Sequence, residues 1–426
     1  MREPMGPETW PEAAELRDMA AVCLNLVRRQ RPLSPFIDNG RTVFVTDTPE
    51  LFATILEERA DVYARPGHPY RDLLPLYEDA GSFALGLNVA PGAGREAGAS
   101  IRRTIAEETA DTARALAERC DGGSPVTLLG AAREVTLRAI VRILFGVDAA
   151  PWAQEFVRSA GLVEAWQVMV RRPHGHPALA DALAAMEVRY RAADRILAAA
   201  TVPLPPPSGP FHPRLTVIET LMNAYNGLAT ALAWTLLELA RRPEVLALVQ
   251  AEADAAGEGT GGRSGPGLPF TIQVAKETLR LHPVAWAIGR RALREDRLAG
   301  HDVAPGAAVV CCIYALHRNP ALWAEPEAFL PERFAPGSAA RHRLAYLPFG
   351  AGDLACPAGH LVPMMLVSLL AGLLREHRVE VQAPERVGSR TLVSLHPHPD
   401  PAVRIAPRGP RPPAPAPAAG AGRQSA

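Results

Sequence analysis

Apolar residues recur every three to four positions along most of the chain, which is the spacing of a helix with a buried face. This spacing predicts helices over residues 11–30, 100–120, 126–146, 176–200, 215–241, 271–282 and 358–375. Short β-like runs bounded by Gly, Pro or Asp stand near residues 41, 307, 378 and 401. The pattern therefore predicts a mainly α-helical protein with small β-sheets beside the helical body.

Three segments carry no pattern of this kind. Residues 201–213 are rich in proline, which removes backbone donors and clashes with a preceding helical turn, so they predict a loop. Residues 257–267 are rich in glycine and predict a flexible connection. From Pro407 the chain is largely Pro, Ala and Gly, with almost nothing to bury. We therefore expect one domain over residues 1–406 and a disordered tail over residues 407–426.

Composition narrows the choice of partners. Lys and Arg together number 45, as do Asp and Glu, so the formal net charge is zero. Such a chain lacks the positive surface that holds nucleic acid or an anionic membrane, which favours a small-molecule partner. The N-terminus has no signal-peptide pattern, and no apolar run reaches the roughly 18 residues of a membrane-spanning helix. The five cysteines are odd in number and lack CxxC spacing, which argues against disulfides or zinc and indicates a cytoplasmic protein.

The stretch YLPFGAGDLACPAGHL, residues 346–361, has two interpretations. Gly350, Gly352 and Ala355 fit the GxGxxA turn of a dinucleotide-binding domain, but that domain needs several alternating strands and helices, and too few residues follow. Alternatively, the glycines make a thin loop that presents Cys356 at a helix N-terminus, where the helix dipole favours a thiolate. Pro357 suits the first helical position. Such a loop could supply the proximal ligand of a haem iron, or Cys356 could be an inert buried cysteine.

Further motifs favour the haem interpretation, because together with the cysteine loop they resemble the cytochrome P-450 family from about residue 30 to residue 406. The family's loop, Phe-Gly-x-Gly-x-Arg-x-Cys-x-(Gly/Ala), is matched by Phe349, Gly350, Gly352, Cys356 and Ala358. The resemblance implies the family's mainly helical fold, a b-type haem (iron protoporphyrin IX), and Cys356 as the axial thiolate.

Two more motifs stand upstream of the loop in the family's order. KETLRLHP supplies the family's Glu-x-x-Arg pair as Glu277 and Arg280, which share a helix face at i and i+3. PERF supplies Arg333, which in family members completes a buried network and can fork onto the same carboxylate. Either motif alone could be a solvated charge pair. In this order they indicate a structural network beside the haem.

The resemblance is incomplete where the family binds the haem propionates. The family usually places Arg or His two residues before the cysteine, where this chain has Leu354, and often Trp or His where it has Gly98. The remaining positions that align with propionate-binding arginines are Arg102 and Arg290.

The helix predicted over residues 215–241 resembles the family's central helix, which crosses the distal face of the haem. The family's Ala-Gly-x-(Asp/Glu)-Thr-Thr is replaced here by Asn223, Ala224, Tyr225, Asn226, Gly227 and Leu228. The acid has become Asn226 and the alcohol Gly227, although in the family this pair relays protons for dioxygen activation. We expect the distal surface to be formed by Asn223, Ala224, Asn226 and Gly227.

The substrate pocket predicted from the resemblance follows the Glu-x-x-Arg helix. Its candidates are Val284, Ala285, Trp286 and Ile288, with Tyr225 from the central helix. Core packing is the competing interpretation for the aromatic residues, because aromatic side chains are buried wherever they occur.

Three functions remain open from the sequence. The first is a monooxygenase that tailors a small organic molecule, as in bacterial secondary metabolism, with protons from water, Asn226 or the substrate. The second is an atypical haem-thiolate enzyme that activates an N–O or O–O bond of its substrate for rearrangement, dehydration or nitrene-type C–N bond formation. The third is a haem-binding protein without catalysis. The monooxygenase would need electrons from ferredoxin and ferredoxin reductase, since the sequence holds no flavin or iron–sulfur domain.

Overall fold

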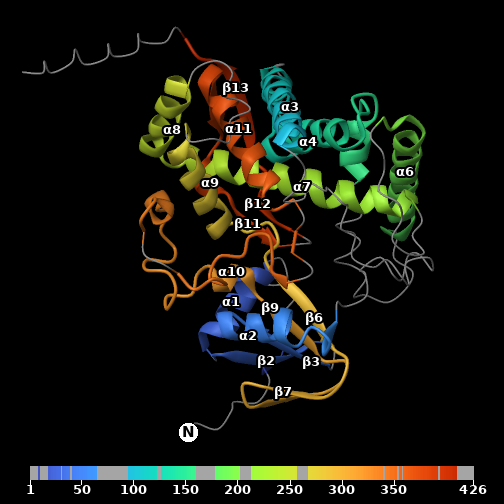
Figure 1. The fold of residues 1–426 in the computed structure, drawn as a ribbon, viewed down its shortest axis with the longest axis vertical. Helices are drawn as coiled ribbons and strands as arrows, with labels where there is room; N and C mark the ends of the chain where they lie inside the picture. The colour runs from blue at the N-terminus through green and yellow to red at the C-terminus, as the bar shows by residue number, and fades with distance from the viewer. Residues whose placement is uncertain are drawn as a thin grey trace, which may run out of the picture.

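The computed structural model describes residues 8–9, 18–29, 31–38, 41–64, 95–121, 126–159, 178–201, 213–256, 267–338, 341–352, 355–356, 358–391 and 394–409. The helical part of the protein fills the upper half of Figure 1. Its helices are α3 (Arg95–Asp121), α4 (Leu128–Phe145), α6 (Ala178–Ala199), α7 (Pro213–Ala240), α8 (Pro243–Ala256), α9 (Pro269–Leu281) and α11 (Leu361–Glu376).

Helix α7 is the centre of this half and crosses the middle of the view (Figure 1). It contacts α4, α6, α8, α9 and α11, and its C-terminal part also meets strands β10 and β12. A helix surrounded on all sides must be apolar nearly all round. This explains the run ALAWTLLELA at residues 231–240, of which all but the last are buried. The functional positions on α7 are therefore held in a rigid frame.

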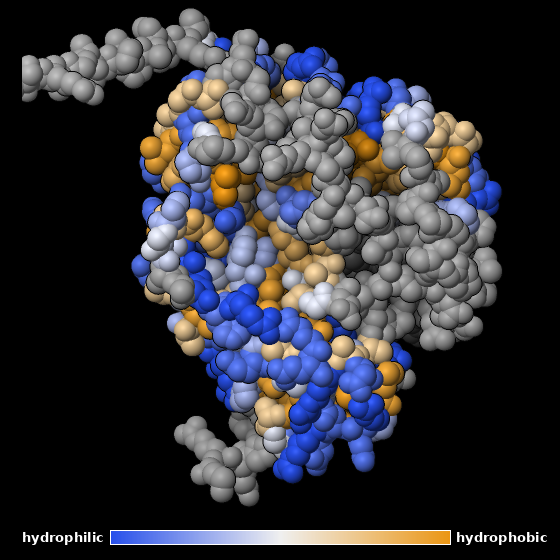
Figure 2. Space-filling view, viewed as in Figure 1, coloured by the Kyte–Doolittle hydropathy of each residue, from blue (hydrophilic) through white to orange (hydrophobic). Residues whose placement is uncertain are grey.

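The lower half of Figure 1 contains a six-stranded sheet with the order β1-β2-β3-β9-β6-β4. Its strands are β1 (Glu8–Thr9), β2 (Leu33–Asp38), β3 (Arg41–Thr46), β9 (Ala308–Cys311), β6 (Ile288–Ala292) and β4 (Tyr63–Ala64). Short helical segments lie beside it: α1 (Met19–Arg29), α2 (Pro49–Ala53) with a π-helical continuation over Thr54–Glu58, and α10 (Ile313–Leu316). The surface over this sheet is mostly hydrophilic in the view of Figure 2.

Three smaller sheets complete the described part of the chain. They are β10 (His377–Val381) with β13 (Ala402–Pro407) and β5 (Val126–Thr127); β11 (Gly388–Thr391) with β12 (Leu395–His398); and β7 (Asp296–Leu298) with β8 (His301–Val303). The hairpin β11/β12 matters for the site, because β12 contacts α7. Within the described ranges, no helix combines the length and apolar character needed to cross a lipid bilayer.

The predicted fold class, mainly α-helical with small sheets, is confirmed. All seven predicted helices and four predicted strands are present within the described ranges, whereas α2, α8, α10 and the strands β1, β2, β4, β5, β6, β7, β8, β11 and β12 were not predicted. None of residues 345–349 is in a strand, so the strand required by the dinucleotide interpretation is absent and that interpretation is wrong. Residues 11–17, 202–212, 257–266 and 410–426, including most of the predicted tail, lie outside the described residues.

Candidate functional site

The cysteine loop connects the turns after residue 341 to helix α11. The N–H of Cys356 donates to the carbonyl oxygen of Phe349 at 2.8 Å, and the N–H of Gly359 donates to the carbonyl oxygen of Cys356 at 3.1 Å. These bonds close the loop around the cysteine through backbone atoms alone. All five cysteines are free, and Cys356 is the one whose side chain is exposed. The sequence therefore places its one accessible thiol on a backbone-ordered loop.

Gly352 keeps this loop thin. Its φ is +69°, a left-handed conformation that favours glycine, and an added Cβ atom would lie 2.5 Å from the carbonyl oxygen of Leu56 in the π-helical turn. Real carbon and oxygen atoms do not approach so closely, so any side chain here would push the loop away. Gly350 adopts the same kind of conformation, with a φ of +76°. The glycines that the sequence assigned to a thin loop are thus required by its geometry.

The helix after the loop begins later than predicted. Helix α11 begins at Leu361 rather than at residue 358, and residues 358–360 form a turn. Cys356 therefore precedes the first helical turn, while Pro357 and Leu354 lie outside the described residues. The surrounding protein raises the pKa of the Cys356 thiol, and the backbone N–H of Ala358 opposes that rise by donating towards the sulfur. A nearby backbone N–H, rather than the dipole of α11, is the contact that favours negative charge there.

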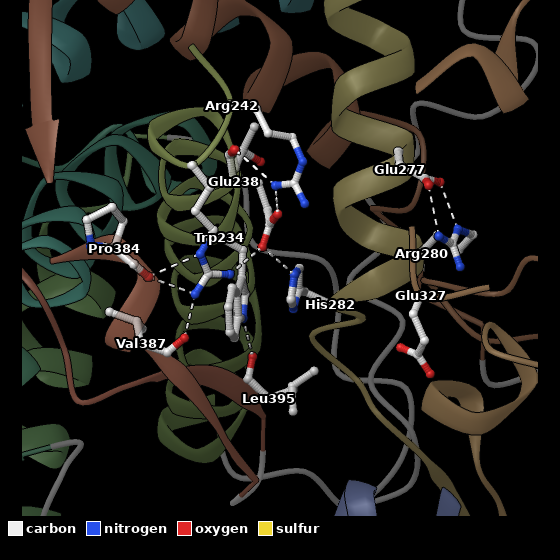
Figure 3. Close-up of polar contacts among 12 residues, drawn as sticks. Trp234, Glu238, Arg242, Glu277, Arg280, His282, Glu327, Pro384, Val387 and Leu395 are labelled. Atoms are coloured by element: carbon white, nitrogen blue, oxygen red, sulfur yellow. Dashed lines mark hydrogen bonds and ion pairs between the residues drawn. The ribbon is translucent and has the colours of Figure 1, made fainter. Parts of the chain in front are cut away.

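Glu277, Arg280 and Arg333 form one network beneath the loop. The guanidinium of Arg280 forks onto the Glu277 carboxylate, with Nε–Oε2 at 2.7 Å and Nη2–Oε1 at 2.8 Å (Figure 3). Arg333 Nε donates to Glu277 Oε1 at 3.3 Å, and the N–H of Leu330 donates to the same oxygen at 2.8 Å. Glu277 and Arg280 are both fully buried. A buried pair of this kind is tolerated only when its hydrogen-bonding groups are satisfied.

The remaining N–H groups of Arg280 donate to backbone carbonyl groups. Nη1 donates to the carbonyl oxygens of His317 at 2.8 Å and Pro326 at 2.7 Å, and Nη2 donates to that of Ala328 at 2.9 Å. Arg280 therefore joins helix α9 to the segment that follows α10. The network holds together the chain on the side of the protein from which the cysteine loop emerges.

His317 is part of the same structure and was not predicted. Its Nδ1 lies 3.0 Å from the carbonyl oxygen of Arg280, which can only accept a proton, and its Nε2 lies 2.9 Å from the N–H of Leu347, which can only donate one. The two contacts fix the neutral tautomer with the hydrogen on Nδ1. Full burial lowers the pKa of His317 to about 3. Its one sequence signal is a histidine ending the apolar run IYALH, 30 residues before its partner Leu347.

Because His317 is neutral when folded, acid should destabilise the protein through this residue. Below about pH 6.5 the unfolded chain binds a proton at His317 and the folded chain does not, so stability falls as the pH drops from about 6.5 to about 3. At pH 5 we expect this residue to cost about 2 kcal/mol relative to pH 7. Urea unfolding at the two pH values should show a smaller difference for His317→Gln than for the wild type, while the exposed control His342→Gln should leave it unchanged. If the loss of stability between pH 7 and pH 5 were equal in all three proteins, the assignment of this loss to His317 would be contradicted.

A second buried cluster links α7 to the hairpin β11/β12 (Figure 3). Trp234 stacks on His282 with ring centroids 3.8 Å apart and donates its indole N–H to the carbonyl oxygen of Leu395 at 3.0 Å. Glu238 lies 3.0 Å from His282 Nε2 and pairs with Arg241 and Arg242. Burial lowers the pKa of His282, and the hydrogen bond with Glu238 opposes that shift. The cluster fixes the position of β12 against the central helix.

Two predicted distal positions on α7 border open space. Ala224 and Gly227, one helical turn apart, are partly exposed although most of the surrounding helix is buried. A Cβ atom added to Gly227 would meet no atom of the described residues within 4 Å outside the backbone of its own helix. Asn223 lies in α7, but its side chain is outside the described set. The space at Gly227 is wide enough for a ligand or water to approach the helix.

Asn226 does not face this space freely, because both ends of its amide are bound. Its Oδ1 accepts a hydrogen bond from Arg133 Nε of α4 at 2.9 Å, and its Nδ2 donates to Ser394 Oγ at 3.1 Å. The residue is 7% exposed. The structure therefore makes Asn226 a bridge between α4, α7 and the hairpin.

Tyr225 differs from its predicted place in the pocket. It is fully buried, and its ring packs edge to face against Phe156 at 5.9 Å. Successive helical residues are turned by 100°, so Tyr225 points about 160° away from Gly227. Tyr225 belongs to the core between α4 and α7 and does not line the open space.

The side chains of residues 284–288, which follow α9, pack against different parts of the protein. Val284 packs on the main helical core, Trp286 on the cluster around α1, and Ile288 on the core of the six-stranded sheet, whereas Ala285 is exposed. Trp286 is thus at least in part a packing residue, as the competing interpretation held.

Of the two predicted propionate ligands, Arg290 is the one whose side chain the structure describes. Arg290 lies on β6, is 6% exposed, and donates from Nη1 to the carbonyl oxygen of Gly289 at 2.9 Å. Arg102 and Gly98 both lie in α3, and the side chain of Arg102 is outside the described set.

Comparisons with known proteins agree on one family. The family model "Cytochrome P-450" matches residues 212–401. Trimethyltridecatetraene synthase of Zea mays is 36% identical over 181 residues, which are 39% of this chain and 33% of the relative. Cytochrome P-450 135B1 of Mycobacterium tuberculosis is 30% identical over 297 residues, 66% of this chain and 60% of the relative. The matched region thus spans about a third of the first plant relatives. The crystal structure of cytochrome P450DA heme domain superposes with a TM-score of 0.78 at 21% identity, covering 95% of this chain and 98% of that one.

The residues present fit a haem. The exposed sulfur of Cys356 is free to coordinate iron, and the loop residues Phe349 and Ala358 pack on the same core cluster as α7. On α7, Gly227 has no side chain, and a Cβ atom added there would meet no described atom within 4 Å outside its own helix. The described residues hold no group of three or more His, Cys, Asp or Glu side chains suited to a metal ion.

Proposed function

Since the chain belongs to the cytochrome P-450 family, whose cofactor is haem b, we propose that it is a haem-thiolate oxidoreductase acting on a small organic molecule. When bound, the haem supplies the oxidising chemistry, and the protein supplies ligation, orientation and control of protons. Cys356 is the axial thiolate in this proposal. Phe349, Gly350, Gly352 and Ala358 shape its loop, and Arg290 and Arg102 are the propionate-binding residues.

The Glu277–Arg280–Arg333 network and His317 act as positioning residues in this proposal. Arg280 donates to the carbonyl oxygen of His317, and His317 in turn accepts the N–H of Leu347, two residues before Phe349. Two hydrogen bonds therefore connect the buried ion pair to the start of the cysteine loop, so a displacement of Arg280 would shift that loop. This arrangement supports the proposal because a sulfur ligand must be held at one position to act on iron.

The proposed reaction rests on the identity and the contacts of residues 226 and 227. An amide does not titrate, and both ends of the Asn226 amide are already engaged by Arg133 and Ser394. Gly227 has no side chain and faces open space. We propose a monooxygenase-type oxidation in which the proton comes from water beside Gly227 or from a hydroxyl or amine of the substrate.

The same observation favours a second candidate. An enzyme that takes its oxidising equivalent from an N–O or O–O bond of the substrate needs no acid–alcohol pair for dioxygen. Asn226, locked as a bridge, and Gly227, without a side chain, suit such an enzyme equally well. Rearrangement, dehydration and nitrene-type C–N bond formation belong to this class.

Turnover separates the two candidates. A mixture of bacterial secondary metabolites would be incubated with the reconstituted protein with or without dioxygen, ferredoxin and ferredoxin reductase. Products that require all three support the monooxygenase; products formed without dioxygen or reductase overturn it in favour of the second candidate. The five free cysteines fit operation in a reducing cytoplasm, where such electron donors reside.

The double variant Asn226→Glu/Gly227→Thr sharpens this test. If proton delivery limits the reaction, the fraction of reducing equivalents recovered in product should rise, and there is space for the added side chain at position 227. The single variant Gly227→Ala fills the same space without a hydroxyl and serves as the control. An equal rise in both variants would point to packing rather than to proton delivery.

A further inference from the structure

The hairpin β11/β12 presents two different faces. Ser389 and Thr391 of β11 donate from their hydroxyls to Asp18, which precedes α1. Residues alternate between the faces of a strand, so Arg390 lies on the opposite face. Arg390 is directly across from His396 in the antiparallel register, and the Oγ of Ser394, two residues before His396, accepts a hydrogen bond from Asn226 Nδ2. The face that carries Arg390 and His396 is therefore directed to α7 and α4.

Both side chains hold buried nitrogen atoms without a partner. His396 is 7% exposed, and its Nδ1 has no hydrogen-bond partner. Arg390 is not an exposed residue, and its Nε is buried and likewise has no partner. Buried polar groups of proteins are almost always hydrogen-bonded, and each exception costs roughly 1–3 kcal/mol. Two such nitrogen atoms opposite each other on one face indicate a missing hydrogen-bonding partner between or beside them.

The surroundings of these two nitrogen atoms are positively charged. Burial, followed by the charges of Arg133, Arg390 and His398, lowers the pKa of His396 to about 4, which places both arginines within electrostatic range of the imidazole. Arg133 also binds Asn226, where an acid would have supplied a negative charge at this point. Within the described ranges no acidic side chain pairs with Arg390, so the partner missing from this face is an anion.

We propose that Arg390 and His396, with Arg133 behind Asn226, form a subsite that binds a carboxylate of the substrate. This inference rests on the proposed function, because it is the distal pocket beside Gly227 that would bring the substrate to α7. A guanidinium matches the two oxygens of a carboxylate, and a histidine N–H can complete the contact. Trp234 and its cluster hold the hairpin in place, so the subsite is built on a rigid support (Figure 3). The enzyme therefore takes acidic substrates in preference to neutral ones of the same shape.

Binding of matched probes tests this subsite without turnover. Isothermal titration calorimetry of the haem-loaded protein would compare decanoate with decanamide, which differ in charge at one end. We expect decanoate to bind at least about tenfold more tightly, since charge-assisted hydrogen bonds are the stronger kind. Arg390→Gln and His396→Gln should each reduce that preference, and the double variant should abolish it. Arg386→Gln, whose side chain is 83% exposed on the preceding turn, should leave it intact.

Each outcome decides the matter. Equal binding of the two probes, no binding of either, or a preference that survives the double variant overturns the carboxylate subsite. Thermal unfolding midpoints of the variants would be measured in parallel, and a reduced preference counts only in variants that unfold at the wild-type temperature. The carbon monoxide spectrum of the same samples tests the proposed function separately: a thiolate-type band without a carboxylate preference removes only the subsite.

Discussion

Replacing Cys356 by serine is expected to abolish the thiolate-type Soret band that reduced, haem-loaded protein gives with carbon monoxide. A serine hydroxyl stays protonated near neutral pH and cannot donate electron density to iron as a thiolate does. The fold of the loop should survive, because its closing hydrogen bonds join backbone atoms of Phe349, Cys356 and Gly359. Absorption spectra of the reduced protein with and without carbon monoxide would measure the effect, which we expect to be a complete loss of the band.

The control for this substitution is a cysteine far from the loop. Cys120 near the end of α3 is 5% exposed and free, so Cys120→Ser makes the same chemical change at a buried site. It should retain the band in whatever fraction of the protein folds. A band of normal intensity in Cys356→Ser would show that another group ligates the iron, and the proposed function would then lose its central residue.

The parts of the site that the sequence could predict are those fixed by short-range spacing. Glu277 and Arg280 are three residues apart on one helix, and the glycines of the cysteine loop stand within six residues of the cysteine. Local geometry alone brings such residues together. The long helix α7 was predicted for the same reason, because the spacing of its apolar residues can be recognised without knowledge of any distant contact.

The parts that it could not predict depend on contacts between distant segments. His317 finds Leu347 30 residues away, Asn226 finds Arg133 93 residues away, and Trp234 finds Leu395 161 residues away. No periodicity marks such pairs, because they are set by how helices and hairpins pack. For this reason the sequence showed that residue 226 is no longer an acid, but only the structure shows that its amide is tied at both ends.

Glu277→Gln is expected to remove about 3–5 kcal/mol from the free energy of unfolding, the usual result of leaving a buried charge uncompensated. The carboxylate is fully buried and accepts from Arg280, Arg333 and the N–H of Leu330. Glutamine has nearly the same shape, so the loss would come from charge and hydrogen bonding and not from a cavity. Its NH₂ group would also face guanidinium donors, whose positive charge would then be buried without a counter-ion. Urea unfolding at pH 7 would measure the change.

An exposed ion pair shows why burial decides this effect. Glu155 lies 3.1 Å from Arg191, and both side chains are nearly half exposed. Water and salt screen such a pair, so Glu155→Gln should cost no more than about 1 kcal/mol although it deletes the same charge. A comparable loss in the two variants would mean that the Glu277 network is not the stabilising element the structure indicates. A large loss confined to Glu277→Gln would instead establish that the cysteine loop is supported by a buried network, joined to it through Arg280 and His317.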